Sequence, residues 1–408
     1  MNPPASESRA ATVAEVLGLV CSACTPLDPE PVALAAALGR VLRETMTAPE
    51  DQPPFTRSAV DGYAVRLDDP TPEFRIVDTL RAGDWRPREL QPGEAVRIAT
   101  GAALPADSLQ VIMKEDAALG EGAVRPLARD RERHIRERGE DALAGQPLVT
   151  APARLSAGAL ALLASIGATN PRVTRLPRVL HLATGNEIVP PDQPPAPGQI
   201  RDSNSTLVHA FLATHGITPA QHYAPENYDA GAALLRDPAL GAAAVDLLLI
   251  SGGASVGDND FTCRLLEEHG YSILLRKTAA RPGKPLIFAR RGAALAFGLP
   301  GNPLAHFVCL HLFVQAALTA MAGLPATNPF QPGVLASDLA ADGNARETLW
   351  PARWQLVKGT AALTPLRWIS SGDLGSLATA NAFIRVPAGA GLLARGTWVE
   401  FAPTLPQP

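Results

Sequence analysis

Three uninterrupted apolar segments, each followed at once by a loop rich in small polar residues, constrain the fold of this chain most strongly. They are RVLHLA at 178–183, VDLLLI at 245–250 and AALAFG at 293–298. Segments of this kind, in which polar and apolar residues do not alternate, indicate strands that are buried on both faces. Helical stretches at 204–216 and 260–270 separate them. The sequence therefore predicts a doubly wound, mostly parallel α/β sheet.

The loops that follow these strands are the first candidates for a binding site. They read TGNE at 184–187, SGGASVGDND at 251–260 and LPGNP at 299–303. Because ligands of open α/β sheets bind beyond the carboxyl ends of the strands, we expect the three loops to converge on one cleft. Glu187 follows its strand directly, where a carboxylate can reach a metal ion or a ligand N–H group.

The middle loop carries the most chemical information. Its glycines allow backbone N–H groups to approach an anion, and Ser251 and Ser255 add hydroxyl donors. The acids Asp258 and Asp260 follow, and a phosphate-binding loop beside carboxylates is typical of a magnesium–phosphate site. Capping of a helix by either aspartate is the alternative. Neither a Walker lysine nor a G-x-G-x-x-G is present, so neither a P-loop nor a dinucleotide site is predicted.

Two further features add positive charge to the same cleft. In RPGKP at 281–285, Arg281 and Lys284 are held on a proline-stiffened turn, which favours a clamp for an oxyanion. Asn302 fits the N-cap and Pro303 the first position of a helix. That explains the shape of the loop, and it also directs a positive helix end into the cleft.

The rest of the chain has a different pattern of apolar and polar residues from the α/β part. Residues 12–24 and 29–42 have helical spacing, short apolar alternations between prolines and glycines fill 48–147, and a helical pattern returns at 155–168. An antiparallel β domain is therefore predicted as an insertion. Short strands after residue 328 predict a small terminal β domain. The predicted division is a helical linker domain of 1–47 and 146–177, an inserted β domain of 48–145, an α/β domain of 178–326 and a C-terminal β-barrel-like domain of 327–408.

Composition excludes several classes of protein. With 46% hydrophobic and 19% charged residues the chain is not disordered as a whole. The net charge of −4 argues against bulk nucleic-acid binding. Cys21 and Cys24 form a C-x-x-C, but no second pair lies near and both fall within a helical pattern, so two small helix residues are the preferred interpretation.

One segment is long and apolar enough to test for a membrane span. Residues 303–324 contain no Lys, Arg, Asp or Glu. His306, His311 and Gln315 interrupt the segment and its flanks lack cationic or aromatic anchors, so we predict a helix buried in the α/β core. The opening MNPPASESRA is polar, unlike a signal peptide, and a cytoplasmic location is expected.

Eight motifs together resemble those of a known family. PPFTRSAVDGYAVR, RIATGA, ERGEDALAGQ, LATGNEI, ISGGASVGDNDF, RPGKP, FGLPGNP and GSLATANAFIRVP occur here in the order found in molybdopterin molybdotransferases, the MoeA family that includes the E domain of gephyrin. The resemblance covers nearly the whole chain. It implies an elongated, multidomain homodimer of the α/β plus β class, in which the α/β unit holds molybdopterin and the β insertion, from the same or the partner subunit, closes the cleft.

The resemblance also implies an activity and its residues. Such proteins insert molybdate into adenylylated molybdopterin and release AMP with Mg²⁺ present, giving molybdenum cofactor. The catalytic candidates are Asp61, Thr100, Glu187 and Asp260. The metal candidates are Glu187, Glu226 and Asp260. The substrate-binding candidates are Ser251, Gly252, Gly253, Ser255, Gly257, Arg281, Lys284, Pro300, Gly301, Asn302, Arg346 and Ser371.

Departures from the family pattern keep alternatives open. Asn186 replaces a usual acid, a commonly acidic pair reads Glu226-Asn227, and Ala305 replaces a serine. A non-catalytic or altered-specificity paralogue, acting as a molybdopterin-binding or scaffold protein, is the alternative. A nucleotide-processing hydrolase is a second, against which the SAVDGYAVR insertion argues. The expected partners are small-molecule substrates, a second copy of the chain, and, transiently, other molybdenum cofactor biosynthesis proteins and molybdoenzyme chaperones, with no nucleic acid and no membrane.

Overall fold

The computed structural model describes residues 9–128, 131–225, 228–237, 245–252 and 259–404, with the side chains of 259–260 left out. Contacts between residues divide the chain into two compact units. The first unit comprises Met1–Glu30, Gly39–Val41 and Val173–Pro408, and the second comprises Pro31–Leu38 and Leu42–Arg172. The four-part division expected from the sequence stays a prediction.

A six-stranded sheet with the order β18-β15-β19-β22-β21-β20 forms the centre of the first unit. Its parallel strands are β18 (Ala220–Ala224), β15 (Val179–Thr184), β19 (Leu247–Ser251) and β22 (Ala294–Leu299). Two antiparallel strands, β21 (Ile287–Arg291) and β20 (Ser272–Leu275), complete it. Every residue of β15 and β19 is buried. The prediction of a mostly parallel α/β sheet is confirmed.

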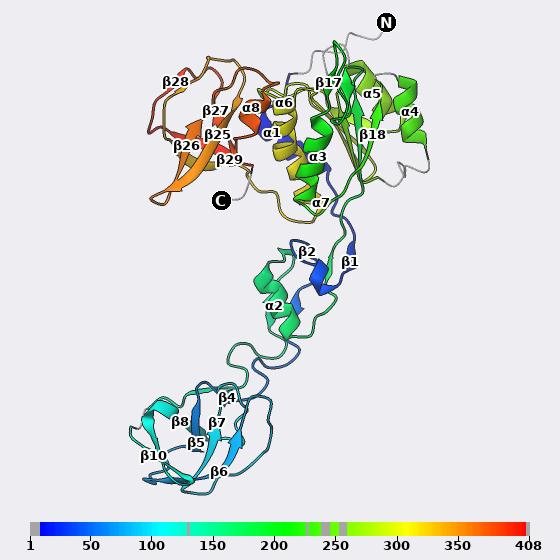
Figure 1. The fold of residues 1–408 in the computed structure, drawn as a ribbon. Helices are drawn as coiled ribbons and strands as arrows, with labels where there is room; N and C mark the ends of the chain where they lie inside the picture. The colour runs from blue at the N-terminus through cyan, green and yellow to red at the C-terminus, as the bar shows by residue number, and fades with distance from the viewer. Residues whose placement is uncertain (1–8, 129–130, 226–227, 238–244, 253–258, 405–408) are drawn as a thin grey trace. The chain divides into compact units, whose positions relative to one another are not determined.

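Helices cover both faces of this sheet (Figure 1). Helices α1 (Val13–Ala23), α3 (Asn204–Ala213), α6 (Pro303–Cys309) and α7 (Gln315–Met321) pack on one face, and α4 (Tyr228–Arg236) and α5 (Asn259–Glu268) on the other. Alternate residues of β19 explain this, because Leu247 and Leu249 join the first core and Leu248 and Ile250 the second. Buried strands need both faces covered, as the continuous apolar pattern predicted.

The apolar segment at 303–324 is part of the core. Helices α6 and α7 are joined by a π-helical turn (Leu310–Val314) into one run, Pro303–Met321. Within the described residues it alone is long and apolar enough to cross a membrane, by length and composition only, with a mean hydropathy of 1.7. Of its most apolar window 67% is buried inside the protein, where Leu304, Val308 and Phe313 pack in the core. A core helix of this kind is what the sequence predicted.

The region around 29–42 differs from the prediction. It forms β1 (Pro29–Pro31), a 3₁₀ turn (Leu34–Ala36) and β2 (Val41–Leu42), so the predicted helix is wrong. The strands join a sheet of order β1-β14-β2-β13, with β14 at Arg172–Thr174 and β13 at Ala153–Arg154. Each of the two prolines disfavours the helical conformation of the residue before it, here Asp28 and Glu30, and Gly39 adopts a φ of 74°.

The neighbouring helices follow the sequence more closely. Helix α2 (Ala157–Ser165) forms as predicted behind the N-cap Ser156. Helix α1 also forms, closed by a capping box between Thr12 and Glu15. It packs in the α/β core through Val13, Val16 and Val20.

The second unit contains the predicted β insertion, drawn in blue to cyan in Figure 1. Its main sheet has the order β8-β5-β7-β6-β10-β9. These strands are β5 (Gly62–Arg66), β6 (Phe74–Leu80), β7 (Glu94–Ile98), β8 (Leu109–Met113), β9 (Ala117–Leu119) and β10 (Ala123–Pro126). The pairs are antiparallel except β6 with β7, which is parallel. Two short pairs accompany the sheet: β4 (Arg57–Ser58) with β11 (Ile135–Arg136), and β3 (Met46–Thr47) with β12 (Pro147–Val149).

The C-terminal part of the first unit is a closed barrel of order β23-β26-β25-β27-β29. Its strands are β23 (Gln331–Leu335), β25 (Thr348–Val357), β26 (Thr360–Pro365), β27 (Ala382–Val386) and β29 (Trp398–Pro403). A small pair, β24 (Leu339–Ala340) with β28 (Leu392–Leu393), and the one-turn helix α8 (Leu374–Leu377) complete it. The terminal β domain is confirmed.

Candidate functional site

A cavity of about 400 Å³ lies at the carboxyl ends of the parallel strands in the first unit. All three loops predicted to converge contribute to its lining, and the segment leading into α3 adds a fourth side. The lining includes Thr184, Gly185, Glu187, Arg201, Asp202, Ser203, Asn204, Ser251, Gly252, Pro285, Pro300, Gly301, Asn302 and Pro303. A concave space of this size suits a ligand of cofactor dimensions.

Gly252 gives this cavity its close backbone approach. Its φ is 90°, and a Cβ atom there would lie 2.3 Å from the carbonyl oxygen of Thr184. The Thr184 hydroxyl also donates to the Ser251 carbonyl at 3.0 Å, which holds the two strand ends together. Only glycine fits here. The rest of the predicted anion loop (Gly253, Ser255 and Gly257) lies outside the described residues.

The wall formed by Pro300, Gly301 and Asn302 is tied to its neighbours by side-chain amides. Asn204 Nδ2 donates to the Gly301 carbonyl at 2.7 Å, and Asn302 Nδ2 donates to Ser371 Oγ at 2.9 Å. Asn302 precedes α6 as expected, with Pro303 at the first helical position, but its side chain makes no capping bond. The structure thus joins Ser371, of the C-terminal part, to the cavity wall.

Asn204 was missed by the sequence analysis. The available signal was the run Asp202-Ser203-Asn204 at the start of the helical pattern, because these residue types favour helix starts. Asp202 indeed accepts hydrogen bonds from the N–H and hydroxyl groups of Ser205. The sequence did not show that this helix start borders the predicted cleft.

Glu187 is the described member of the predicted metal site. Its exposed carboxylate lines the cavity and is an oxygen donor of the type that Mg²⁺ prefers. Glu226 and the side chain of Asp260 lie outside what the structure describes. Among the residues that are described, no group of three His, Cys, Asp or Glu side chains could hold a metal ion. The predicted ligand set remains a prediction.

The predicted cations form two groups, and none of them is among the described residues that line the cavity. Arg281 makes an ion pair with Asp342 and lies over the ring of Trp368, 4.8 Å from its centroid. Arg346 donates to the Ala280 carbonyl at 3.3 Å, and burial, together with the charge of Arg281, lowers its pKa. Arg281 and Arg346 are therefore neighbours, and the guanidinium of Arg281 is already engaged.

Lys284 differs from both arginines. Its side chain is exposed, it forms no ion pair within the described part of the chain, and the next residue, Pro285, lines the cavity. Arg346 is likewise without an ion pair in the described part of the chain but is half-buried, so of the three predicted cations Lys284 is the one that is both unpaired and exposed.

A second cavity, of about 240 Å³, lies in the β insertion. Strand β5 begins where β7 and β8 end, and β6 ends beside β7, so four strand ends meet at one edge of the sheet. Gly62 is required there because a Cβ atom would lie 2.0 Å from the Ile112 carbonyl oxygen. The lining is Asp61, Gly62, Tyr63, Thr79, Leu80, Arg81, Arg97, Ile98, Ala99 and Lys114.

Asp61 and Thr100 are brought together at this second cavity, as their shared assignment suggested. The Asp61 carboxylate accepts from the Thr100 backbone N–H at 2.7 Å and from its hydroxyl at 2.8 Å. These bonds, and the charges of Lys114 and Arg97, lower the pKa of Asp61. One fixed carboxylate is thus surrounded by three cations, Arg81, Arg97 and Lys114, in a cavity of net positive charge.

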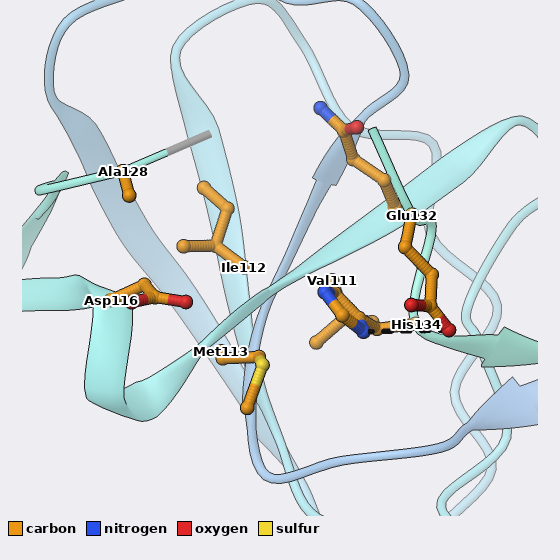
Figure 2. A pocket seen from close by; sticks show the side chains of 8 residues that line it. Val111, Ile112, Met113, Asp116, Ala128, Glu132 and His134 are labelled. Atoms are coloured by element: carbon orange, nitrogen blue, oxygen red, sulfur yellow. Dashed lines mark ion pairs between the residues drawn. The ribbon is translucent and has the colours of Figure 1, made fainter. Parts of the chain in front are cut away.

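A third cavity, shown in Figure 2, is too small for such a ligand. Its volume of about 20 Å³ leaves room for about one water molecule. Glu132 and His134 line it, with Nδ1 of His134 4.0 Å from Oε1 of Glu132. It is not a candidate for substrate binding.

Comparison with known proteins supports one family along the whole chain. Residues 11–167 match the MoeA N-terminal region (domain I and II), residues 181–320 a probable molybdopterin binding domain, and residues 332–404 the MoeA C-terminal region (domain IV). The molybdopterin molybdenumtransferase of Bacillus subtilis is 34% identical over 391 residues, covering 92% of this chain and 90% of the relative. That of a Nostoc species is 33% identical over 395 residues, covering 93% and 90%.

A solved structure agrees with these matches. The crystal structure of a molybdopterin biosynthesis moeA protein from Pyrococcus horikosii is 28% identical, with a TM-score of 0.80, and covers 98% of this chain and 100% of the other. Three family models match the chain in order, and the two relatives are matched over nine-tenths of their length. Together with this fold, these matches show that the chain belongs to the MoeA family.

Proposed function

We propose that this chain is a molybdopterin molybdenumtransferase, which inserts molybdate into adenylylated molybdopterin and releases AMP during molybdenum cofactor biosynthesis. The observation that carries the proposal is the cavity of about 400 Å³ at the strand ends, within the segment matching the probable molybdopterin binding domain. The relatives matched over most of the chain carry this enzyme's name, so a purely scaffolding role is not favoured.

The cavity lining suits the phosphate-bearing part of such a substrate. Gly252 lets the backbone approach a phosphate closely, and the α6 helix begins at the cavity wall. The Ser251 hydroxyl and the amides of Asn204 and Asn302 lie around the same space. Phosphoryl cleavage depends on positioning and charge neutralisation more than on covalent catalysis, so a site built from donors is appropriate.

The proposal assigns Mg²⁺ to Glu187, Glu226 and Asp260. When bound, the ion would neutralise charge on the pyrophosphate as AMP leaves. Glu187 supports this assignment because its carboxylate is exposed to the cavity.

For molybdate, the proposal assigns Lys284 first and then Arg346, Arg281 and Ser371. Lys284 is exposed and forms no ion pair among the described residues. Molybdate is a dianion, for which a charged hydrogen-bond donor is well suited. Arg281 would have to exchange Asp342 for the ligand. Ser371 is already bonded to the cavity wall through Asn302.

In the β insertion, the proposal assigns Asp61 and Thr100 to the reaction. Thr100 holds the carboxylate of Asp61 through two hydrogen bonds, and three cations beside it favour an anionic group of the substrate. The proposal further includes a homodimer and a cytoplasmic enzyme acting beside other proteins of the same biosynthesis. Sedimentation of the full chain as a 42.7 kDa species at micromolar concentration would contradict the dimer.

The direct test is an AMP-release assay. The purified chain is incubated with adenylylated molybdopterin, Mg²⁺ and molybdate, and AMP is measured against time. We expect release that needs all three components. Tight binding of adenylylated molybdopterin without any AMP release would favour the non-catalytic alternative instead.

A further inference from the structure

A row of polar side chains crosses the otherwise apolar face of the sheet that packs against α3 and α6. Gln221 of β18 pairs with His181 of β15 in register, and Ser251 of β19 lies one step further toward the carboxyl edge on the same face. Gln221 Nε2 lies 2.9 Å from His181 Nδ1, and His181 Nε2 lies 2.6 Å from Ser251 Oγ. The row therefore leads from an outer strand to the lining of the cavity.

Hydrogen-bond accounting fixes the direction of this row. Gln221 Nε2 also donates to the Ser205 carbonyl at 2.9 Å, which identifies that atom as the amide nitrogen. Its second hydrogen is then donated to His181 Nδ1, so the ring proton must be on Nε2. His181 consequently donates to Ser251 Oγ. The serine hydroxyl accepts this bond and keeps its own hydrogen for another acceptor.

The surroundings keep His181 in the neutral form that this direction requires. His181 and His306 are both fully buried. Burial, together with the nearby His306 ring, lowers the pKa of His181 to about 3. His306 donates from Nδ1 to the Pro300 carbonyl at 3.0 Å. Burial lowers the pKa of His306 to about 4, although the charge of Asp202, in the segment before α3, acts in the opposite direction. A neutral histidine whose two nitrogens are both hydrogen-bonded can be buried in an apolar face, and a fully satisfied buried network holds its members in fixed positions.

We propose that His181 and Gln221 are positioning residues that fix the Ser251 hydroxyl as a hydrogen-bond donor into the cavity, toward an anionic phosphate oxygen of the ligand. This rests on the proposed function, since it names the part of the substrate that Ser251 meets. Ser251 is 3% exposed and lines the cavity, and within the described residues no acceptor is found for its own hydrogen. The sequence alone had assigned Ser251 as a donor but contained no indication of what orients it.

The first test reads the tautomer without any ligand. Nitrogen NMR of the full chain with labelled histidine, with His181 assigned by the folded variant His181→Gln, should show a protonated Nε2 and an unprotonated Nδ1. The pattern should persist from about pH 8 to about pH 5, since the ring stays neutral there. A protonated Nδ1, or a ring that titrates near its ordinary pKa, would overturn the proposal whatever the protein's function.

The second test is a double-mutant cycle on binding and turnover. Ser251→Ala and His181→Phe should each weaken binding of adenylylated molybdopterin about tenfold, since one hydrogen bond to a charged group is lost. The double variant should lose little more, because His181 acts through Ser251. His181→Gln, which keeps a donor near the position of Nε2, should recover part of the loss. His311→Gln, at a histidine bonded to the Phe307 carbonyl within α6–α7, is the matched control and should leave affinity unchanged.

The outcomes separate this proposal from the proposed function. In one outcome, the wild-type chain shows the expected tautomer and the expected non-additive binding losses but releases no AMP. That result would refute the enzyme assignment alone. Normal AMP release with additive losses in the cycle would refute the positioning role alone. If the wild-type chain fails to bind adenylylated molybdopterin at all, both are wrong.

Discussion

The cavities of about 400 Å³ and about 240 Å³ in the described part of the chain are built in opposite ways. In the first unit the cavity is formed by strand ends, a glycine that no other residue can replace, and hydroxyl and amide donors, over a buried row of neutral polar groups. In the β insertion the cavity is formed by exposed charges, one carboxylate among three cations. Shape and fixed dipoles dominate the first, and net charge dominates the second. The two should therefore respond differently to substitution, to acid and to salt.

The largest effect should come from changing the backbone approach in the first cavity. Gly252→Val would place a Cβ atom 2.3 Å from the Thr184 carbonyl oxygen, in a conformation with φ of 90° that β-branched residues avoid. We expect binding of adenylylated molybdopterin to fall by about 10³-fold or more, measured by calorimetric titration. Gly292→Ala, with φ of 59° and open space around the added Cβ, is the control for backbone strain alone. Wild-type affinity in Gly252→Val would remove this residue from the phosphate site.

The second largest difference should be in how acid changes the stability of the two units. Burial lowers the pKa of His181 to about 3 and that of His306 to about 4, from an ordinary 6.5. Below 6.5 the unfolded chain binds these protons and the folded chain does not, so stability is full above that pH and is lost as the pH falls from 6.5 toward 4. At about pH 5 each histidine should cost the first unit about 2 kcal/mol.

The β insertion should lose stability in a lower pH window. Hydrogen bonds from Thr100 lower the pKa of Asp61. A hydrogen bond from the Ala144 backbone N–H, and then the side chain of Arg138, lower the pKa of Asp51. Such carboxylates stabilise the fold above their ordinary pKa, near 4, and that contribution is lost only as the pH falls below it. Hydrogen exchange between about pH 7 and about pH 5, corrected for the intrinsic rate, should rise in β15 and β19 and not in β5 and β7. Equal increases in both regions would contradict this comparison.

In the β insertion, removing a charge should affect the reaction more than changing the shape of the cavity does. Asp61→Asn keeps the size of the side chain and an oxygen that can accept both Thr100 bonds, so at this exposed position only the small stabilisation by the charge should be lost. On the proposed function AMP release should fall about 10²-fold, the scale of losing one well-placed charge in phosphoryl transfer. Thr100→Val removes only the hydroxyl bond of 2.8 Å, keeps the backbone bond of 2.7 Å, and should show a smaller loss. A larger effect for Thr100→Val than for Asp61→Asn would reverse the assigned roles.

The smallest effect should be at Lys284. Removing its charge in Lys284→Ala should raise the molybdate concentration for half-maximal AMP release about tenfold, with little change in affinity for adenylylated molybdopterin. Lys358→Ala, at a turn between β25 and β26, is the matched control. If Lys284→Ala weakens the pterin substrate as much as molybdate, the lysine binds phosphate and the separation of the two ligands is wrong.

The sequence predicted those parts of the fold that local patterns determine. Continuous apolar runs identified β15, β19 and β22, and their loops were placed correctly at one edge because parallel strands share it. The pattern failed at 29–42, where alanine-rich spacing favoured a helix but Pro29 and Pro31 and tertiary pairing produced short strands. It also failed to show that β6 and β7 run parallel, since pairing direction depends on residues distant in the chain.

The candidate site shows the same division. Motifs indicated Ser251, Gly252 and Asn302, and the cavity contains them. Three features could not be read from the sequence: the amide of Asn204 on Gly301, the carboxylate of Asp342 on Arg281, and the orientation of Ser251 by His181. Each is a contact between segments remote in sequence. His181 in particular was concealed, because one polar residue in RVLHLAT does not disturb the pattern of a buried strand.

The most direct test of the contrast between the two cavities measures affinity and turnover in the same two variants. Binding of adenylylated molybdopterin and subsequent AMP release would be determined for Gly252→Val and Asp61→Asn beside the wild-type chain. We predict that Gly252→Val loses binding, and that Asp61→Asn binds within a few-fold of wild type but releases AMP about 10²-fold more slowly. Loss of binding by Asp61→Asn to the same degree as by Gly252→Val, or unchanged AMP release in Asp61→Asn, would contradict the account.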